Sequence, residues 1–387
     1  MPKTWQTKLI HPDAHAPQGY RSLTTPVYRG STTLFPSASL VDDHWDQDAG
    51  YTYGLYGTPT SLELAARICE LERGTRTLLA PGGQAAISLV DLALLKSGDH
   101  VLLPASAYGP NRKLTSGLLS RFGVDATFYD PLVGAGIAAL IRENTRLIWT
   151  ESPGSVTMEI QDVPAIAAAA HARGVKVVLD NTWSAGVLFD AFEHGVDIAV
   201  QALTKYVGGH SDLLLGSVTV REDDLYRALG SARQVLGCAV SPDDCSLALR
   251  GLQTLSVRLA AIERSALTIA QWLADRPEVE RVLHPAFESC PGHEYWKRDF
   301  TGSSGVFSVV FKPGPTQKQV FAFADALELF EIGYSWAGVT SLIVTYALGR
   351  GPGRPAYEHR IARLSIGLES TEDLIADLSQ ALAKIRD

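Results

Sequence analysis

The chain has few cysteines and no long hydrophobic run. Only four of its 387 residues are cysteine, Cys69, Cys238, Cys245 and Cys290, and no two have the C-x-x-C spacing. A chain of this length can bury a large core without disulfides, so we expect reduced, mostly buried thiols and no metal site. No apolar stretch approaches the roughly 18 residues of a membrane span, and the first residues contain no apolar signal segment. We therefore expect a cytoplasmic protein with no membrane partner.

An excess of positive charge is also missing. The 34 Lys and Arg are outnumbered by 42 Asp and Glu, which gives a formal net charge of −8. Binding nucleic acid broadly requires a basic face, so nucleic acid is not an expected partner, although a local phosphate pocket remains open. The content of 46% hydrophobic and 20% charged residues is that of a globular protein. The length suits two or three domains of about 150 residues each.

The pattern of apolar residues divides the chain into three parts. Residues 1–60 are rich in proline and carry no clear period, which indicates an extended arm. From 61 to 250, short runs of Val, Ile and Leu alternate with helical patterns, the first of them a helix from Ser61 as N-cap to Gly74. This alternation predicts an α/β fold with a large, mostly parallel sheet covered on both faces. Residues 251–387 predict a smaller α+β domain that opens with a long helix over 252–276.

Two residues mark a candidate site. Asp180 ends the apolar run "VKVVLD", and ligands of parallel α/β sheets lie outside the carboxyl ends of the strands. Lys205 follows another apolar run, in "VQALTKYVGGHSD". Alone, the acid could be a helix cap and the lysine a surface residue. Together, a lysine that attaches an aldehyde cofactor and an acid that holds a protonated pyridine nitrogen would suit pyridoxal phosphate.

Two glycine-rich stretches could bind phosphate. Gly82 and Gly83 precede a predicted helix in "APGGQAAISLV", where backbone N–H groups and the helix dipole favour an anion. This signal is weak by itself, since a plain loop-to-helix junction looks the same. The segment "VGAGIAAL" matches G-x-G-x-x-A but follows Asp130 and Pro131 in place of a strand, so we interpret it as a helix start and not a dinucleotide site.

The order of these parts, with Tyr108 between the glycines and Asp180, is that of fold-type-I pyridoxal-phosphate enzymes. From about residue 20 to 375 the chain resembles the Cys/Met-metabolism family of those enzymes, and most closely its bacterial β-lyases. The similarity is carried by specific stretches: "YGLYGTPT", "ESPGSVTMEIQDVPAI", "LDNTWSAGVLF", "TKYVGGHSD", "HEYWKRDFTGSSGVFS", "YSWAG" and "RLSIGLE". The resemblance implies a fold-type-I transferase-like domain over 61–250 that binds pyridoxal 5'-phosphate, and a C-terminal domain over 251–387.

The resemblance also implies a role for each matching residue. Lys205 would carry the cofactor, Asp180 would pair with the pyridine nitrogen, and Tyr108 would stack on its ring. Gly83, Gln84 and the Thr204 hydroxyl would hold the phosphate. Arg363 would bind the substrate α-carboxylate as a bidentate fork, in a pocket that Ser335 and Trp336 line. The position of Trp336 is what favours the β-lyases within the family. No metal is implied.

The same resemblance explains the extended arm of residues 1–60. Tyr53 would reach the phosphate and substrate of a neighbouring subunit, so the chain would form a homodimer of active-site-sharing subunits and, beyond it, a homotetramer. Three positions depart from the family: Leu55 where many members have a phosphate-binding Arg, Ala202 where many have Ser, and Asn111-Arg112-Lys113 near Tyr108 where some have an acid. The candidates to replace the missing Arg are Arg29, Arg112 and Lys113.

The resemblance implies α,β-elimination from L-cystathionine, which yields homocysteine, pyruvate and ammonia and belongs to transsulfuration in methionine biosynthesis. Lys205 or Tyr108 would protonate the departing sulfur. Three alternatives stay open: a broader cysteine-S-conjugate β-lyase, a γ-lyase or sulfhydrylase, and a cofactor-bound regulatory protein.

Overall fold

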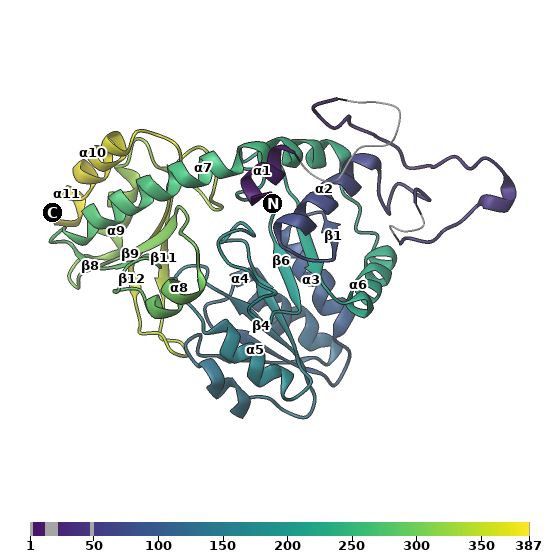
Figure 1. The fold of residues 1–387 in the computed structure, drawn as a ribbon. Coiled ribbons are helices and arrows are strands. Elements are labelled where there is room, and N and C mark those ends of the chain that lie inside the picture. The colour runs from purple at the N-terminus through teal and green to yellow at the C-terminus, as the bar shows by residue number, and fades with distance from the viewer. Residues whose placement is uncertain (1–2, 12–21, 47–49, 387) are drawn as a thin grey trace.

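A computed structural model describes residues 3–11, 22–46 and 50–386 of the chain. Two sheets stand side by side, and one long helix, α7 (Pro242–Ala274), runs along both of them (Figure 1). An extended arm leaves the body beside the larger sheet (Figure 1). The N-terminal segment and the arm belong to the part of the chain that was predicted to be irregular.

The larger sheet has the strand order β1-β7-β6-β5-β4-β2-β3 in the described residues. Neighbours from β6 to β3 run parallel, whereas β7 runs antiparallel to both β1 and β6. The α/β fold with a mostly parallel sheet is therefore confirmed. The strands are β1 (Arg76–Ala80), β2 (His100–Pro104), β3 (Asp125–Tyr129), β4 (Thr145–Glu151), β5 (Lys176–Asp180), β6 (Ile198–Gln201) and β7 (Gly216–Val220).

Helices cover both faces of this sheet because its strands are apolar on both sides. Trp149 of β4 belongs to the core on the face of α3 and α6, while its neighbour Ile148 belongs to the core on the face of α5. Alternate side chains of a strand point to opposite faces, so a strand buried on both faces is a continuous apolar run. The helices around this sheet are α2 (Pro59–Leu71), α3 (Gly83–Leu94), α4 (Gly109–Lys113), α5 (Val163–His171) and α6 (Asp223–Leu236), with a π-helix (Leu114–Leu118) and 3-10 helices at Leu119–Phe122 and Gly134–Ala139.

The smaller sheet has the order β10-β11-β12-β9-β8 and packs against helices of the C-terminal third. Its strands are β8 (Val279–Leu283), β9 (Val306–Phe311), β10 (Glu331–Ile332), β11 (Leu342–Leu348) and β12 (Glu358–Ser365). The helices are α8 (His293–Asp299), α9 (Gln317–Asp325), α10 (Thr371–Ala381) and α11 (Ala383–Arg386). The proposed boundary between residues 250 and 251 falls inside α7, so the exact division into domains stays a prediction.

Several element boundaries differ from the sequence expectation. The helix expected to begin with Ser61 as its N-cap is α2, which is capped by Thr58; Ser61 is the third helical residue and completes a capping box with Thr58. Pro59 at the first helical position explains the earlier start, since proline suits that position. The long helix expected from residue 252 begins at Pro242, after the Ser241 cap, for the same reason.

The segment "VGAGIAAL" was predicted to be a helix start that does not follow a strand. It forms the 3-10 helix Gly134–Ala139, and β3 does end shortly before it, at Tyr129. The strand was missed because "DATFYD" has only a short apolar pattern. A short 3-10 helix is not the long α-helix that a dinucleotide site requires, so the conclusion against that site is unchanged.

The arm is only partly irregular. A short helix that the sequence analysis did not predict, α1 (Trp5–Ile10), is capped by the Thr4 side chain. A 3-10 helix spans Ala38–Leu40, and Thr32 forms a β-bridge with Tyr53. The Thr60 side chain fixes the arm to α2, because its hydroxyl donates to the Pro26 carbonyl at 2.8 Å. Part of the proline-rich stretch, residues 12–21, lies outside the described residues.

The four cysteines are free thiols, as expected. Cys245 and Cys290 are buried, whereas Cys69 and Cys238 are only partly buried. Among the described residues, no helix is both long enough and apolar enough to cross a membrane.

Candidate active site

The carboxyl edge of the larger sheet brings two acids together. Asp180 ends β5 and Glu151 ends the neighbouring strand β4, and the two are register partners. Both residues are half-buried, and the loss of solvent around their carboxyl groups raises the pKa of each. Asp180 accepts hydrogen bonds from the Thr182 backbone N–H (3.1 Å) and hydroxyl (2.5 Å), both at Oδ1. Its second oxygen has no such partner recorded among the described residues.

Lys205 lies in the turn that follows β6, one strand beyond Asp180. Its Nζ donates to the Ser335 hydroxyl at 2.6 Å and lies 5.5 Å from the centroid of the Trp336 ring. Burial, with the nearby positive charge of Arg363, lowers the pKa of the Lys205 amine to about 8 despite the opposite effect of Asp180. A substantial fraction of this amine is therefore neutral near physiological pH, which a nucleophile requires.

Arg363 approaches the same place from the smaller sheet. It lies on β12 and is buried, and its guanidinium donates to the Ser155 carbonyl (3.2 Å) and the Ser335 carbonyl (3.4 Å). The Tyr346 ring on β11 lies under the guanidinium at 5.6 Å. No carboxylate pairs with Arg363 among the described residues. A buried arginine held by neutral groups alone is suited to receive a carboxylate from a ligand.

Tyr108 stands at the mouth of this cluster. It precedes α4, and its backbone N–H donates to Glu151 at 2.6 Å. Its side chain is 42% exposed. Burial, with the negative charges of Asp180 and Glu151, raises the pKa of its hydroxyl above the ordinary value. The protonated phenol is therefore the form present at neutral pH.

The N-terminus of α3 provides the candidate phosphate cradle. No side chain caps this helix at Gly82. A Cβ on Gly83 would lie 2.6 Å from the Ala202 Cβ, so only glycine lets the helix approach the turn that carries Lys205. The Gln84 side-chain oxygen is buried without a hydrogen-bond partner in the described part of the chain. Uncapped N–H groups beside the lysine turn fit an anionic group.

Thr204 is less suited to the role expected of it. Its hydroxyl donates to the Leu215 carbonyl and accepts from the Leu215 N–H, both at 3.1 Å. In this conformation the hydroxyl hydrogen is already donated to the Leu215 carbonyl. Its contact with phosphate therefore stays a prediction that requires the hydroxyl to turn.

Tyr53 lies on the arm and apart from the cluster. Its side chain is 46% exposed, and within the described chain no recorded contact joins it to Lys205, Asp180 or Arg363. Its ring packs edge-on against Tyr56, whose hydroxyl accepts from Gln234 at 2.8 Å. The arm is thus attached to α6 while Tyr53 faces outward.

Of the three candidates to replace an arginine at Leu55, Arg29 is engaged elsewhere. Arg29 pairs with Asp243, and both side chains are exposed. The Arg112 guanidinium lies 5.1 Å from the Phe128 ring, and its Nε is buried without a hydrogen-bond partner in the described part of the chain. Whether Arg112 or Lys113 replaces the missing arginine stays a prediction.

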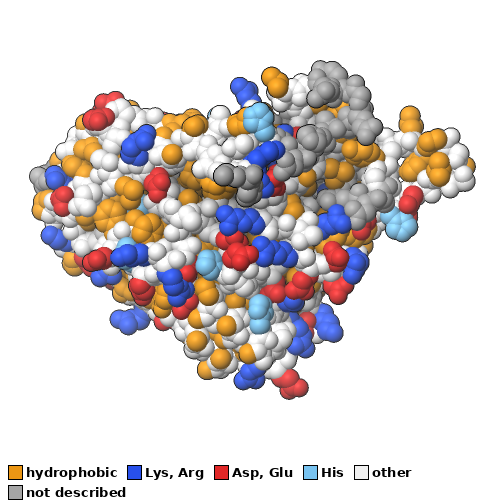
Figure 2. All heavy atoms as spheres, viewed as in Figure 1, with side chains coloured by type: hydrophobic (Ala, Val, Ile, Leu, Met, Phe, Trp, Pro, Cys, Tyr) orange, Lys and Arg blue, Asp and Glu red, His pale blue; other side chains and the backbone are white. Residues whose placement is uncertain are grey.

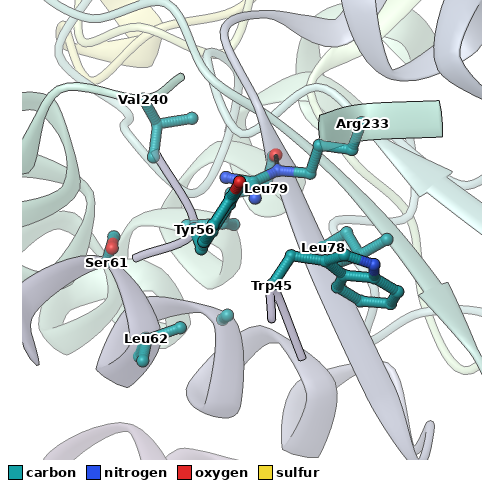
Figure 3. A pocket seen from close by; sticks show the side chains of 9 residues that line it. Trp45, Tyr56, Ser61, Leu62, Leu78, Leu79, Arg233 and Val240 are labelled. Carbon is teal, nitrogen blue, oxygen red and sulfur yellow. Dashed lines mark hydrogen bonds between the residues drawn. The ribbon is translucent and has the colours of Figure 1, made fainter. Parts of the chain in front are cut away.

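A small cavity lies under the arm. Trp45, Tyr56, Val240 and Arg233 line it together with residues of α2 and β1, and Arg233 reaches across to the Leu79 carbonyl (Figure 3). It shares no lining residue with the cluster around Lys205. It is a packing space beneath the arm and not part of the candidate site.

Sequence reasoning missed two residues of the cluster. Glu151 ends a parallel strand as Asp180 does, so the signal used for Asp180 could have found it. Tyr346 lies in a stretch without any motif, and only its place on β11 under Arg363 reveals it.

The fold and the cluster define a class of protein. A half-buried lysine of lowered pKa, an aspartate at a neighbouring strand end and an uncapped glycine-led helix fit pyridoxal phosphate at its aldehyde, pyridine and phosphate groups. Such a cluster at the carboxyl edge of a mostly parallel sheet is that of a pyridoxal-phosphate enzyme of the α/β type.

Comparisons with known proteins support the assignment to this class. The family model for Cys/Met metabolism PLP-dependent enzymes matches residues 6–383. A putative cystathionine beta-lyase of Rhizobium johnstonii is 44% identical over 97% of this chain and 95% of its own length. Cystathionine beta-lyase MetC of Escherichia coli is 39% identical over 99% of both chains. The crystal structure of metB from Corynebacterium glutamicum superposes with a TM-score of 0.91 at 31% identity and covers 98% of both chains.

This chain belongs to the family of Cys/Met metabolism PLP-dependent enzymes. Pyridoxal phosphate is accordingly its cofactor.

Proposed function

We propose that this protein is a carbon-sulfur β-lyase that cleaves L-cystathionine to homocysteine, pyruvate and ammonia. The observation that carries the proposal is the meeting of Lys205, Ser335 and Arg363 in one partly buried cluster, where a nucleophilic amine and a carboxylate-binding guanidinium share a serine residue. The relatives named as cystathionine beta-lyases, at 39–44% identity over nearly the full chain, support this substrate.

The residues that would hold the cofactor surround its expected position. Lys205 would bind it covalently, Asp180 would hold its pyridine nitrogen, and Tyr108 would cover its ring. The N–H groups of Gly83 and Gln84, with Thr204 after rotation of its hydroxyl, would hold its phosphate. When bound, pyridoxal phosphate supplies an electron sink for the pair left at Cα after its proton is removed.

The chain's own groups would orient the substrate and move its protons. Arg363 binds the α-carboxylate, and Ser335 and Trp336 form the wall between that arginine and Lys205. The neutral amine of Lys205 takes the Cα proton, and Lys205 or the Tyr108 phenol gives a proton to the sulfur as the Cβ–S bond breaks. The lowered pKa of Lys205 suits both directions of transfer, because a group near the working pH can accept and release a proton.

A second copy of the chain would complete the site. Four large apolar side chains on the arm are exposed, Leu23, Leu34, Leu40 and Val41. Orange side chains gather at the tip of the arm, while Lys and Arg are interspersed with Asp and Glu over the rest of this face (Figure 2). Exposed apolar surface of this kind favours burial against another chain. The arm would place Tyr53 in the partner's site, in a dimer and then a tetramer. A cytoplasmic location also stays a prediction.

A substrate panel tests the function. Purified holoenzyme is given L-cystathionine, S-alkyl cysteines and homoserine esters, and the keto acid is identified. Pyruvate from cystathionine, with homocysteine in equal amount, is expected. Release of 2-oxobutyrate would indicate a γ-lyase, and faster turnover of the cysteine conjugates would indicate the broader β-lyase. A protein that binds the cofactor and releases neither acid would be regulatory.

Hybrid oligomers test the shared site. Tyr53→Ala and Lys205→Ala proteins are each expected to lose activity. Unfolded together and refolded as a mixture, they should regain part of it, since some sites would combine intact halves from two chains. No regained activity in mixed oligomers would contradict an active site shared across subunits.

A further inference from the structure

Glu151 is an acid to which the proposed reaction gives no role. It ends β4 directly beside Asp180, and both residues are half-buried. Two carboxyl groups side by side, partly removed from solvent, disfavour each other's ionisation. A carboxyl group in this place is therefore costly to keep ionised.

Both oxygens of the Glu151 carboxyl group accept hydrogen bonds from residues that line the site. Oε2 accepts from the Tyr108 backbone N–H at 2.6 Å. Oε1 accepts from the Ser155 hydroxyl. One side chain therefore joins the segment before α4 to the turn that follows β4.

The Ser155 turn leads on to the substrate arginine. The Ser155 carbonyl accepts from Arg363 at 3.2 Å. The same residue's N–H donates to the Ser106 carbonyl at 3.1 Å, close to Tyr108 in the chain. A chain of hydrogen bonds thus runs from Tyr108 through Glu151 and Ser155 to the guanidinium. Arg363 comes from the other sheet, and among the described residues its other hydrogen bond, to the Ser335 carbonyl, is longer, at 3.4 Å.

We propose that Glu151 is a positioning residue of the amino-acid site: its carboxyl group fixes the Tyr108 segment and, through Ser155, the guanidinium of Arg363. The inference rests on the proposed function in taking Arg363 as the group that binds the substrate carboxylate. It predicts that loss of Glu151 weakens recognition of a carboxylate in particular, and not of amines in general.

Two unreactive probes separate these effects. L-alanine carries both an amine and a carboxylate, whereas L-alaninamide lacks the carboxylate. Binding of each to the holoenzyme is followed by the change in cofactor absorption. Glu151→Ala is expected to weaken L-alanine about tenfold, the effect of a misplaced charged contact, and L-alaninamide less than about twofold. A merely structural role would weaken both probes equally.

Three further variants sharpen the test. Glu151→Gln keeps an oxygen for the Tyr108 N–H and an NH₂ that can donate to Ser155, so it should restore L-alanine binding to within about threefold. Ser155→Ala removes one link and keeps its carbonyl, so a selective loss of about threefold is expected, even if Glu151→Ala fails to fold. Asp91→Ala removes a buried carboxyl group on α3 and should change the affinity for neither L-alanine nor L-alaninamide.

The proposal is overturned if Glu151→Ala and Ser155→Ala leave the preference for L-alanine over L-alaninamide intact. It is equally overturned if Glu151→Gln loses as much as Glu151→Ala, because charge and not placement would then be the cause. These binding ratios do not depend on the elimination reaction. A failed keto-acid test with a confirmed ratio would reject the lyase and keep the positioning role.

Discussion

Lys205 and Ser335 are 130 positions apart in the sequence, yet the lysine Nζ donates to the serine hydroxyl at 2.6 Å. Ser335 has a positive φ of 88°, a conformation that is uncommon outside glycine. Strained residues of this kind persist where the surrounding structure holds them, often at functional sites. Here the Ser335 side chain meets the lysine while its carbonyl accepts from Arg363. The contact joins the turn after β6 to the loop before β11, and so connects the two sheets at the site.

Attachment of the cofactor should depend on pH through Lys205. Only the neutral amine attacks an aldehyde, and burial lowers the pKa of this amine from 10.5 to about 8. When cofactor-free protein is mixed with pyridoxal phosphate, the rate of forming a borohydride-reducible lysine adduct should rise with pH through a midpoint of about 8. Lys205→Ala should form no adduct on this peptide. A midpoint near 10.5 would contradict the lowered pKa.

Replacement of Arg363 should weaken amino-acid substrates. A hydrogen bond to a charged group contributes about 1.5–3 kcal/mol. Because about 1.4 kcal/mol is a factor of ten, Arg363→Ala should raise KM at least tenfold. Arg363→Lys should recover only part of the substrate affinity that Arg363→Ala loses, since lysine lacks the planar fork. Arg360 on the same strand pairs with Glu280 and serves as the control: Arg360→Ala should leave KM unchanged. An unchanged KM in Arg363→Ala would show that Arg363 does not bind the substrate carboxylate.

Position 55 should limit how tightly the cofactor is held. Leucine offers the phosphate no charge, and Arg29 is paired with Asp243. Cofactor loss on dialysis should therefore be slower in Leu55→Arg, because an arginine adds a charge-assisted hydrogen bond. Leu55→Met, of similar size and uncharged, is the control and should lose cofactor as the parent does. Equal loss rates in all three proteins would end this explanation.

Asp91 should make stability fall as pH rises. It is buried, accepts from the Trp149 indole N–H at 2.8 Å, and burial raises its pKa from 3.8 to about 7. Because the folded pKa is raised, its contribution is fully present below about pH 4 and is lost as pH rises through about 7. Asp91→Asn keeps the acceptor without the charge, so it should gain stability relative to the parent above pH 7, on the order of a few kcal/mol. Denaturant unfolding at pH 5 and pH 8 measures this. An equal fall in both proteins would show that Asp91 is not responsible.

Local sequence determined the framework of the larger sheet. The centres of β4 and β5 are unbroken apolar runs, Leu147–Trp149 and Val177–Leu179, because both faces of these strands are buried, and alternation with helical patterns implied parallel strands. Asp180 could be found because it ends such a run, and Lys205 because it lies in the polar turn shortly after the next strand, β6. Where a cap competed with the pattern, as at Thr58 and Ser241, the pattern alone misplaced the helix start.

The resemblance to a family supplied residues that no local pattern indicates. Arg363 lies within an ordinary strand, and Trp336 in a loop, so their link to Lys205 came from matching stretches and not from spacing. The fold and the family are confirmed by the comparisons. The individual residue roles stay proposals, and Thr204, whose hydroxyl is bonded to Leu215, is the weakest among them.

Only the tertiary structure decided how the site is held together. Glu151 joins Tyr108 to Ser155, and Ser155 meets Arg363 across 208 residues of sequence. Such contacts have no sequence period, because they arise where the edge of one sheet meets the strands of the other. Burial, which lowers the pKa of Lys205 and raises that of Asp180, is likewise a property of that meeting. The sequence carries the chemical groups, and packing between distant segments sets their charges and their neighbours.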